Sequence, residues 1–492
     1  MKSLKTSTAT GPDGIPAIVL KNAADVLAVP CASLFSNFFN ASFLPLLWRT
    51  AQIVPVFKSR KKSDPLNYRP ISLLCILSKV MERIVADAIK SHLACTALLS
   101  PFQFGFRSQH SSLHPILILA HEGHKALESS LAMHVVSLDI KSAFLKVWHE
   151  GLLSKCYSFG IRDPLRSWLR SYLKDRKQFV VVDGFSSHTV PIYSGVPQGS
   201  VLGPLLFLLF INDLSNSLRS RFFFFADDIT LYSTSKATID DDLQLVSSWA
   251  DQWQVTFSPV KTQYIIFRRK HHPFISSSIT FCNTTVHASQ SLKLLGFHLT
   301  DDLSWKNHLL GKLRTAAFRF SAVRRAGRKL SLQSKLHLFK RAIRPFIEYG
   351  SPVISPISSK VVACLERFQR RCVSFGPKLL GSPIDSLSHR RSVASLQILH
   401  NIIHGRVPNP VSSTFHLIPR SFPRLTRSAA ASHPLLFTIP TASKSSKSFC
   451  SSFFPSSLRL WNALPTEIKT VSSPKCFRIA ANAWLRNNPE VY

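Results

Sequence analysis

The 492-residue chain has no apolar run long enough to cross a membrane. Its most apolar stretch, residues 201–211, is too short for a bilayer span and is interrupted by Gly203 and Pro204. The nine cysteines are scattered and include no C-x-x-C pair, so the sequence predicts neither a disulfide framework nor a zinc site. No secretory signal opens the chain. Together these absences favour an intracellular protein with reduced thiols.

Acidic residues are also scarce. The chain has 26 Asp and Glu against 61 Lys and Arg, which gives a formal net charge of +35. A field of this sign favours a polyanionic partner; nucleic acid is the commonest one, and an anionic membrane surface is the competing interpretation. The sequence contains neither a phosphate-binding P-loop nor a serine nucleophile elbow, so the signals of those enzyme classes are missing.

The strongest chemical signal lies in one short stretch. Residues 222–232 read as an apolar strand, a tight turn and a second apolar strand, with Asp227 and Asp228 side by side at the tip. Adjacent carboxylates repel each other, and a divalent cation removes that penalty because hard cations take carboxylate oxygens as ligands. For an isolated pair, the alternative is a solvated turn. A third acid, Asp139, ends the apolar strand 135–140, where a carboxylate is aimed into a cleft.

Two loops carry groups that suit a bound nucleotide. Lys58 and Arg69 belong to a cluster of positive charge between two predicted strands, which is either a triphosphate clamp or a solvated charge run. Between residues 195 and 204, Gly and Pro let the backbone approach a ligand closely, and Gln198 can present its amide. The motif at residues 121–124 has histidines three apart and no evident third ligand, so we expect exposed helix surface there and not a zinc site.

A basic region follows these motifs. Residues 306–344 contain twelve Lys and Arg and no acid, interleaved with apolar residues. This pattern predicts helices with a basic face that could follow a nucleic-acid backbone without reading its sequence; a solvated face is the alternative. Beyond Gly405 the chain is rich in Ser and Pro, which predicts a loose linker or appended segment. The candidate nucleic-acid contacts are Arg324, Arg325, Arg328 and Lys329.

Six motifs together resemble the reverse transcriptases of LINE-type (non-LTR) retrotransposons, closest to those of jockey-like elements. They occur in the order of that family: Tyr68-Arg69-Pro70-Ile71-Ser72, Gln103 to Arg107, Asp139 to Phe144, Gly195 to Gly203, Phe225-Ala226-Asp227-Asp228 and Leu294-Leu295-Gly296. The resemblance implies an α+β right-hand polymerase with fingers, a ferredoxin-like palm and a helical thumb, plus a loosely structured C-terminal segment. The implied domains are an N-terminal lead and helix (1–45), fingers and palm (46–300), a basic helical thumb (301–405) and a Ser/Pro-rich linker with the C-terminal segment (406–492).

The resemblance also implies roles for single residues. Asp139, Asp227 and Asp228 would hold two Mg²⁺ ions, with Mn²⁺ as an alternative, for transfer of a nucleotide to a primer 3′-hydroxyl. Lys261 matches a lysine proposed to protonate pyrophosphate. Phe144 matches a ring that excludes the 2′-hydroxyl of ribonucleotides. The residues expected against the incoming nucleotide are Lys58, Arg69, Ile140 through its carbonyl, Phe144, Gln198 and Gly199.

The implied function is an RNA-directed DNA polymerase with an RNA template, a DNA primer and dNTPs, acting without a membrane in the nucleus or cytoplasm as a ribonucleoprotein. Leu145 stands where the family usually has Asp, and we expect it to weaken activity. No endonuclease domain precedes Gly11, so target nicking is expected from another chain or a missing N-terminal part. Two alternatives stay open: a catalytically silent nucleic-acid-binding remnant of such an element, and an RNA-templated RNA polymerase, which Phe144 disfavours.

Overall fold

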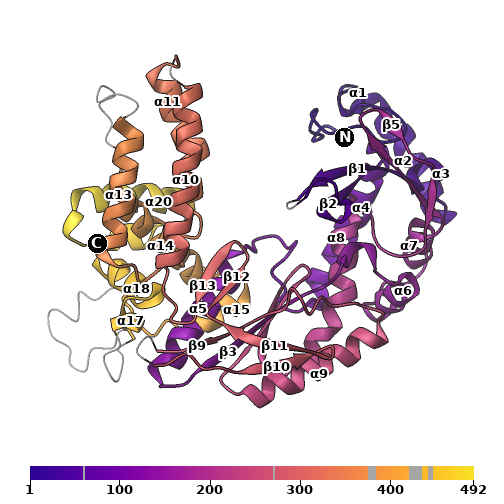
Figure 1. Cartoon of the computed structure of the whole chain (residues 1–492). Coiled ribbons are helices and arrows are strands. Elements are labelled where there is room, and N and C mark those ends of the chain that lie inside the picture. Colours follow the sequence, from indigo (N-terminus) through magenta and orange to yellow (C-terminus); the bar gives the residue numbers. More distant parts are fainter. Residues whose placement is uncertain are drawn as a thin grey trace.

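The computed structural model describes residues 1–58, 61–269, 272–327, 329–374, 384–419, 435–440 and 447–491. It combines helices with mixed sheets. In Figure 1, a group of N-terminal helices with a small sheet and a group of long helices from the later chain stand on opposite sides of a central sheet. Within the described ranges, every helix is too short or too polar to pass through a bilayer.

The central sheet contains six strands, β3 (Met133–Asp139), β7 (Arg221–Phe225), β8 (Asp228–Ser233), β9 (Gln263–Phe267), β10 (Ser278–Phe281) and β11 (Thr284–Ser289). Their order across the sheet is β10-β11-β9-β3-β8-β7. The last four strands in this order are joined only by antiparallel pairs. With α8 (Leu202–Ile211) before β7 and α9 (Lys236–Gln252) between β8 and β9, the elements β3-α8-β7-β8-α9-β9 have the β-α-β-β-α-β arrangement of a ferredoxin-like fold. The α+β class and the ferredoxin-like sheet predicted from the sequence are confirmed.

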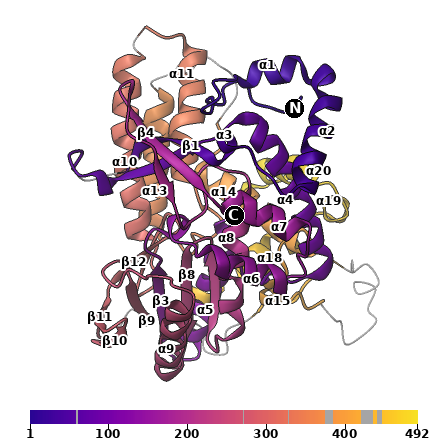
Figure 2. The same ribbon diagram turned by 90° about the vertical axis from the view of Figure 1, so that its right-hand side faces the viewer.

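Both faces of the central sheet are buried, because side chains alternate along each strand. Val136 points to a face that is covered by α8 (Leu202–Ile211) and α9 (Lys236–Gln252). Val135 points to the opposite face, which is covered by α5 (Leu113–Glu128). The sheet therefore separates two hydrophobic cores. Figure 2 shows α9 at the bottom of the molecule, with the small sheet above the central one.

The small sheet has the strand order β2-β1-β4-β5, with β6 beside β4. In this sheet β1 and β2 form an antiparallel hairpin. Helices from the first 175 residues surround it. The elements of this part are α1 (Ala17–Asn22), α2 (Ala24–Asn40), α3 (Leu46–Arg49), β1 (Thr50–Phe57), β2 (Tyr68–Leu73), α4 (Ile76–Thr96), α6 (His149–Ser158), α7 (Leu165–Leu173), β4 (Arg176–Val182), β5 (Phe185–Ser186) and β6 (Val190–Ile192).

A buried carboxylate joins this part to the central sheet. Glu82 of α4 is 1% exposed, and its Oε2 accepts hydrogen bonds from the backbone N–H groups of Val201 (2.8 Å) and Leu202 (3.1 Å). Burial raises the pKa of Glu82, while these N–H groups and Arg176 oppose the rise. An acceptor at a helix N-terminus satisfies donors that have no partner within the helix. Glu82 thus fixes the start of α8.

The later part of the chain begins with a small hairpin and continues as helices. Residues 306–326 and 332–344 are helical, as the basic pattern predicts. In Figure 1, α10 and α13 project away from the central sheet. The elements are β12 (Ser291–Leu294), β13 (Phe297–Thr300), α10 (Lys306–Ala326), α11 (Leu332–Leu338), α12 (Arg344–Glu348), α13 (Ser359–Ser374), α14 (Leu387–Ile403) and α15 (Asn409–Thr414).

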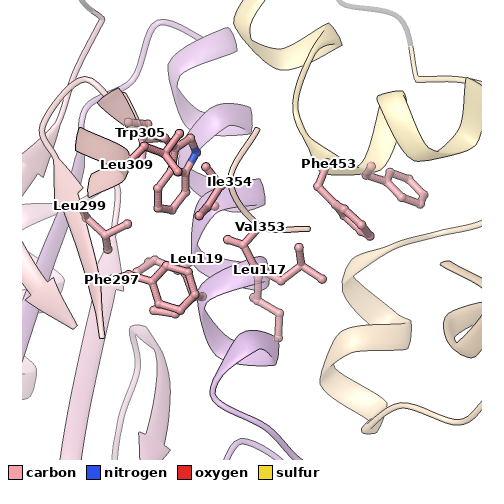
Figure 3. Packing of buried hydrophobic residues seen from close by; sticks show 14 of the residues in the cluster. Leu117, Leu119, Phe297, Leu299, Trp305, Leu309, Val353, Ile354 and Phe453 are labelled. Atoms are coloured by element: carbon pink, nitrogen blue, oxygen red, sulfur yellow. The ribbon is translucent and has the colours of Figure 1, made fainter. Parts of the chain in front are cut away.

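The described residues 447–491 are more structured than their Ser- and Pro-rich composition predicts. They form α17 (Lys447–Cys450), α18 (Phe453–Ala463), α19 (Thr466–Lys469) and α20 (Pro474–Asn487). Trp461 and Phe477 are fully buried in the core that also holds α5. Figure 3 shows Phe453 of α18 on one side of α5 and Trp305 on the other. Apolar residues at helical spacing give α18 a buried face, which outweighs its Ser and Pro content.

The histidines of α5 are covered by other side chains. This contradicts the sequence pattern, which predicts exposed helix surface at this position. The ring of His121 lies 4.8 Å from the ring of Phe415. His124 is buried, and its Nδ1 lies 3.3 Å from the hydroxyl of Ser448. Burial lowers the pKa of both histidines to about 4, so they are neutral at physiological pH. The covering residues come from the distant end of the chain, which a local motif cannot reveal.

Candidate active site

Three acids lie at the ends of neighbouring strands. Asp139 ends β3, and its partner in the strand register is Asp228, the first residue of β8. Ala226 and Asp227 form the two-residue turn between β7 and β8, in which Ala226 has a left-handed φ of 59°. Because side chains alternate, Asp139 lies on the same face of β3 as Val135. The structure therefore brings the three predicted carboxylates to one edge of the central sheet, the edge formed by the strand ends where β3 finishes and β8 begins.

Burial and repulsion from neighbouring carboxylates raise the pKa values of Asp227 and Asp228. Burial first, and then the carboxylates of Asp227 and Asp139, raise the pKa of Asp228 to about 6. Burial also raises the pKa of Asp227, against the opposing effects of its own backbone N–H, Lys261 and Arg69. Both neighbouring carboxylates thus destabilise the ionised form of Asp228. A divalent cation at this edge would relieve the repulsion.

Lys261 offsets part of the negative charge. Its Nζ lies 2.9 Å from Oδ2 of Asp139. The loop before it is fastened to β3, because the backbone N–H of Ser258 donates to the carbonyl of Asp139 at 2.8 Å. The neighbouring Ile140 is buried and pairs with Phe257 across the same junction. A pocket of about 300 Å³ opens here, lined by Ser137, Asp139, Asp228, Val260, Lys261, Gln263, Lys293, Leu294 and Leu295.

The donor set suits a hard divalent cation, because carboxylate oxygens are the ligands that Mg²⁺ and Mn²⁺ prefer. Across the residues that the structure describes, however, no three His, Cys, Asp or Glu side chains are already gathered closely enough to hold a metal. The ammonium group of Lys261 forms an ion pair with the carboxylate of Asp139. The carboxylate oxygens of Asp139, Asp227 and Asp228 are nevertheless the kind of ligand that such an ion takes.

Phe144 lies in a short 3₁₀ turn, Ala143–Leu145, that follows β3. Its ring stacks on Phe207 at a centroid distance of 5.1 Å and meets the edge of Phe106 at 6.0 Å. The carbonyl of Phe144 accepts a hydrogen bond of 2.7 Å from the backbone N–H of Val196. These contacts fix the ring beside the loop that carries Gln198.

The loop with Gln198 and Gly199 is fastened to β2. The carbonyl of Gln198 accepts a hydrogen bond of 2.8 Å from the N–H of Ser72. A Cβ at Gly199, where φ is +131°, would lie 2.5 Å from the carbonyl oxygen of Ser72, so only glycine fits. The same hairpin holds Arg69 on β2 and Lys58 just after β1, both exposed. The predicted phosphate and nucleotide contacts thus belong to one connected unit.

The predicted nucleic-acid contacts lie apart from the carboxylates. Arg324 and Arg325 are exposed in the last turn of α10, and Lys329 is exposed a few residues later. Arg328 falls outside the described residues. Figure 1 shows this end of α10, next to α11, at the far end from the central sheet.

Residues 59–299 match the family described as reverse transcriptase (RNA-dependent DNA polymerase). These residues are a reverse transcriptase domain. The chain is 30% identical over 343 residues to the RNA-directed DNA polymerase from mobile element jockey of Drosophila melanogaster, which covers 65% of the chain and 37% of that protein. It is also 30% identical over 335 residues to the probable RNA-directed DNA polymerase from transposon X-element of the same species, with 65% and 37% covered. The resemblance to LINE-type, jockey-like reverse transcriptases is confirmed.

The chain spans about two fifths of the length of the curated relatives it matches. Among solved structures, telomerase from Candida tropicalis in complex with a fragment of telomeric RNA gives a TM-score of 0.40 at 10% identity, with 78% of this chain and 64% of that chain covered. Reverse transcriptases as a family use divalent metal ions, which agrees with the donor set at the sheet edge.

Sequence reasoning missed two residues near the carboxylates of the reverse transcriptase domain. Gln103 is buried and accepts a hydrogen bond from the N–H of Ala226, one residue before Asp227. Lys293 of β12 lines the pocket beside Asp139. The motif that contains Gln103 was visible in the sequence, but its partner lies 123 residues away. For Lys293, we find no sequence signal beyond its neighbouring apolar turn.

Proposed function

We propose that the chain is an RNA-directed DNA polymerase that adds nucleotides from dNTPs to a primer 3′-hydroxyl on an RNA template. The observation that carries this proposal is the register pair of Asp139 and Asp228, with Asp227 on the adjoining turn, inside a reverse transcriptase domain. Three carboxylates at one sheet edge are the ligands that a two-metal nucleotidyl transfer needs. The names of the related proteins point to the same reaction.

The residues of the site would divide the work as follows. Mg²⁺ ions held by Asp139, Asp227 and Asp228, or Mn²⁺ in their place, would activate the primer hydroxyl and offset the charge of the triphosphate. Lys261, with its ammonium group beside Asp139, would donate a proton to the leaving pyrophosphate. The groups that would bind the nucleotide are Lys58, Arg69, the carbonyl of Ile140, Phe144, Gln198 and Gly199.

The partners of this reaction would be an RNA template, a DNA primer and dNTPs, in a ribonucleoprotein of the nucleus or cytoplasm. Target nicking would be supplied by another chain or by a part of the protein outside this sequence. Primer extension by the purified chain on poly(A)/oligo(dT), with and without Mg²⁺, tests the polymerase directly. Extension that requires the metal supports it.

The second candidate is a catalytically silent, nucleic-acid-binding remnant, and Leu145 is the observation that favours it. Leu145 is 44% exposed beside the proposed gate residue Phe144, between the exposed lysines Lys141 and Lys146. An apolar side chain here places no carboxylate between the two cations. We expect this loss to weaken the enzyme and not to silence it, because Leu145 is not a metal ligand in the proposed site.

Leu145→Asp should therefore raise the rate of primer extension about tenfold, which corresponds to roughly 1–2 kcal/mol of barrier. The new carboxylate would order the neighbouring lysines at little cost in packing, since Leu145 is not part of the buried core. Steady-state extension kinetics measure the effect, and Leu145→Ala controls for removal of the leucine alone. If neither the natural chain nor Leu145→Asp extends a primer while both bind an RNA–DNA hybrid, the remnant is the correct interpretation.

Binding of the hybrid should depend on the exposed cations at the end of α10. Replacing Arg324, Arg325 and Lys329 by Gln in one triple variant should flatten the slope of log affinity against log salt by up to about 2–3. The reason is that fewer phosphate contacts form, so that fewer counterions are released on binding. Fluorescence anisotropy of a labelled hybrid across a salt series measures the slope. The matched control removes three exposed cations elsewhere, Lys174, Lys475 and Arg478. An equal slope change in both triple variants would assign the effect to net charge.

A further inference from the structure

A short segment before α5 lies along the outer edge of the central sheet. The N–H of Phe104 donates to the carbonyl of Phe224 at 2.8 Å, and the N–H of Phe224 donates to the carbonyl of Phe102 at 2.9 Å. Gln103 is thereby paired with Phe224 in a parallel bridge. The segment covers the free edge of β7 and ends beside the turn that carries Asp227.

Gln103 holds that turn directly. The side chain is 2% exposed, and its Oε1 accepts two backbone hydrogen bonds, from Gly105 at 2.9 Å and from Ala226 at 3.1 Å. Ala226 has a left-handed φ, a conformation that residues with a Cβ rarely adopt. Such a conformation persists only where the surroundings fix it. The hydrogen bond from Ala226 is one such constraint, one residue away from Asp227.

Gly105 adds a second constraint on the same turn. A Cβ at this position would lie 2.2 Å from the backbone nitrogen of Ala226 and 3.0 Å from the carbonyl carbon of Phe225. A side chain at position 105 would therefore force the backbone of Phe225 and Ala226, or that of the segment itself, to shift. The two backbones are therefore in direct contact, so that a displacement of one displaces the other.

Among the described residues, the side chain of Gln103 makes its hydrogen bonds through the amide oxygen alone. Its Nε2 is buried and has no hydrogen-bond partner within the described part of the chain. A buried donor without a partner lowers stability, and an apolar side chain of similar size would avoid that loss. The feature that an apolar residue could not reproduce is the acceptor oxygen on the Ala226 turn.

We propose that Gln103 is a positioning residue for the divalent metal site, which it serves by fixing the Ala226–Asp227 turn through Oε1 so that Asp227 and Asp228 can meet Asp139. The catalytic meaning of that site rests on the proposed polymerase function. Metal binding itself can be measured without catalysis, and the two ideas can therefore fail separately.

The test is Mn²⁺ binding to the full chain, followed by electron paramagnetic resonance. Gln103→Asn keeps an amide but shortens its reach to Ala226, and Gly105→Ala displaces the same turn by steric contact. We expect each variant to bind Mn²⁺ about 10–100-fold more weakly, as is typical when a group that orients metal ligands is changed. Gln369→Ala is the matched control, since Gln369 of α13 is also buried and also has one amide atom without a partner.

Circular dichroism and thermal melting establish which variants are folded, and Gln369→Ala should bind Mn²⁺ like the natural chain. Folded Gln103→Asn and Gly105→Ala that keep the natural affinity would overturn the positioning role. So would a natural chain that shows no Mn²⁺ site sensitive to Asp227→Asn. If the natural chain binds Mn²⁺ and Gln103→Asn weakens it, but no primer is extended, the positioning role stands and the polymerase proposal falls.

Discussion

Asp227→Asn should abolish primer extension, with a rate at least about a thousandfold lower, while hybrid binding stays unchanged. The estimate follows from the several kcal/mol that a bound metal contributes to a charged transition state, at about 1.4 kcal/mol for each tenfold. Asn has nearly the same shape as Asp, so the turn can keep its backbone. Because the substitution removes repulsion between neighbouring carboxylates, we expect the melting temperature to be equal or higher, and the pKa of Asp228 to fall.

Single-turnover extension measures the rate of polymerisation, and fluorescence anisotropy measures binding of the hybrid. The matched control is Asp183→Asn, because Asp183 also lies in a two-residue hairpin turn, between β4 and β5, with a left-handed φ of 50°. It is exposed, and its hairpin belongs to the small sheet and not to the central sheet that carries the three acids. Full activity in Asp183→Asn together with none in Asp227→Asn assigns the loss to the site. Extension at the natural rate by Asp227→Asn would remove the metal role of the pair.

Phe144→Ala should raise the incorporation of ribonucleotides relative to deoxynucleotides by roughly 10–200-fold, the range that a change in steric fit usually gives. The ring of Phe144 is held between Phe207 and Phe106, so it cannot easily rotate away from a bulky sugar. Removal of the ring opens space for a 2′-hydroxyl. Some loss of overall rate is expected, because the same ring also supports the turn that follows β3.

Competition between labelled rNTPs and dNTPs in the extension assay measures this selectivity. Phe222→Ala is a suitable control, since Phe222 is another half-buried ring, on β7 of the central sheet, and contacts Phe102 and Phe224. The control should lose stability without a change in sugar preference. An active Phe144→Ala enzyme with natural selectivity would identify Phe144 as a packing residue only.

The sequence was informative where chemistry and local structure coincide. The alternation around Asp139 and the hairpin around Asp227 are local patterns, so strands, turn and candidate ligands could be predicted together. Contacts between distant residues could not. Lys261 meets Asp139 across 122 residues, and Gln103 meets Ala226 across 123, because packing of the whole domain decides those pairs. Composition alone also underestimated α18, whose apolar spacing matters more than its Ser and Pro.

The packing of α5 against α17 and α18 has a consequence for synthesis of the chain. His124 and its partner Ser448 are 324 residues apart, a distance that a ribosome covers in roughly 16–65 s at about 5–20 residues per second. Through that interval, the face of α5 that these helices cover stays open while the central sheet is being completed. A nascent chain with such a face is a natural client for chaperones. The core around α5 can close only after α17 and α18 have left the ribosome.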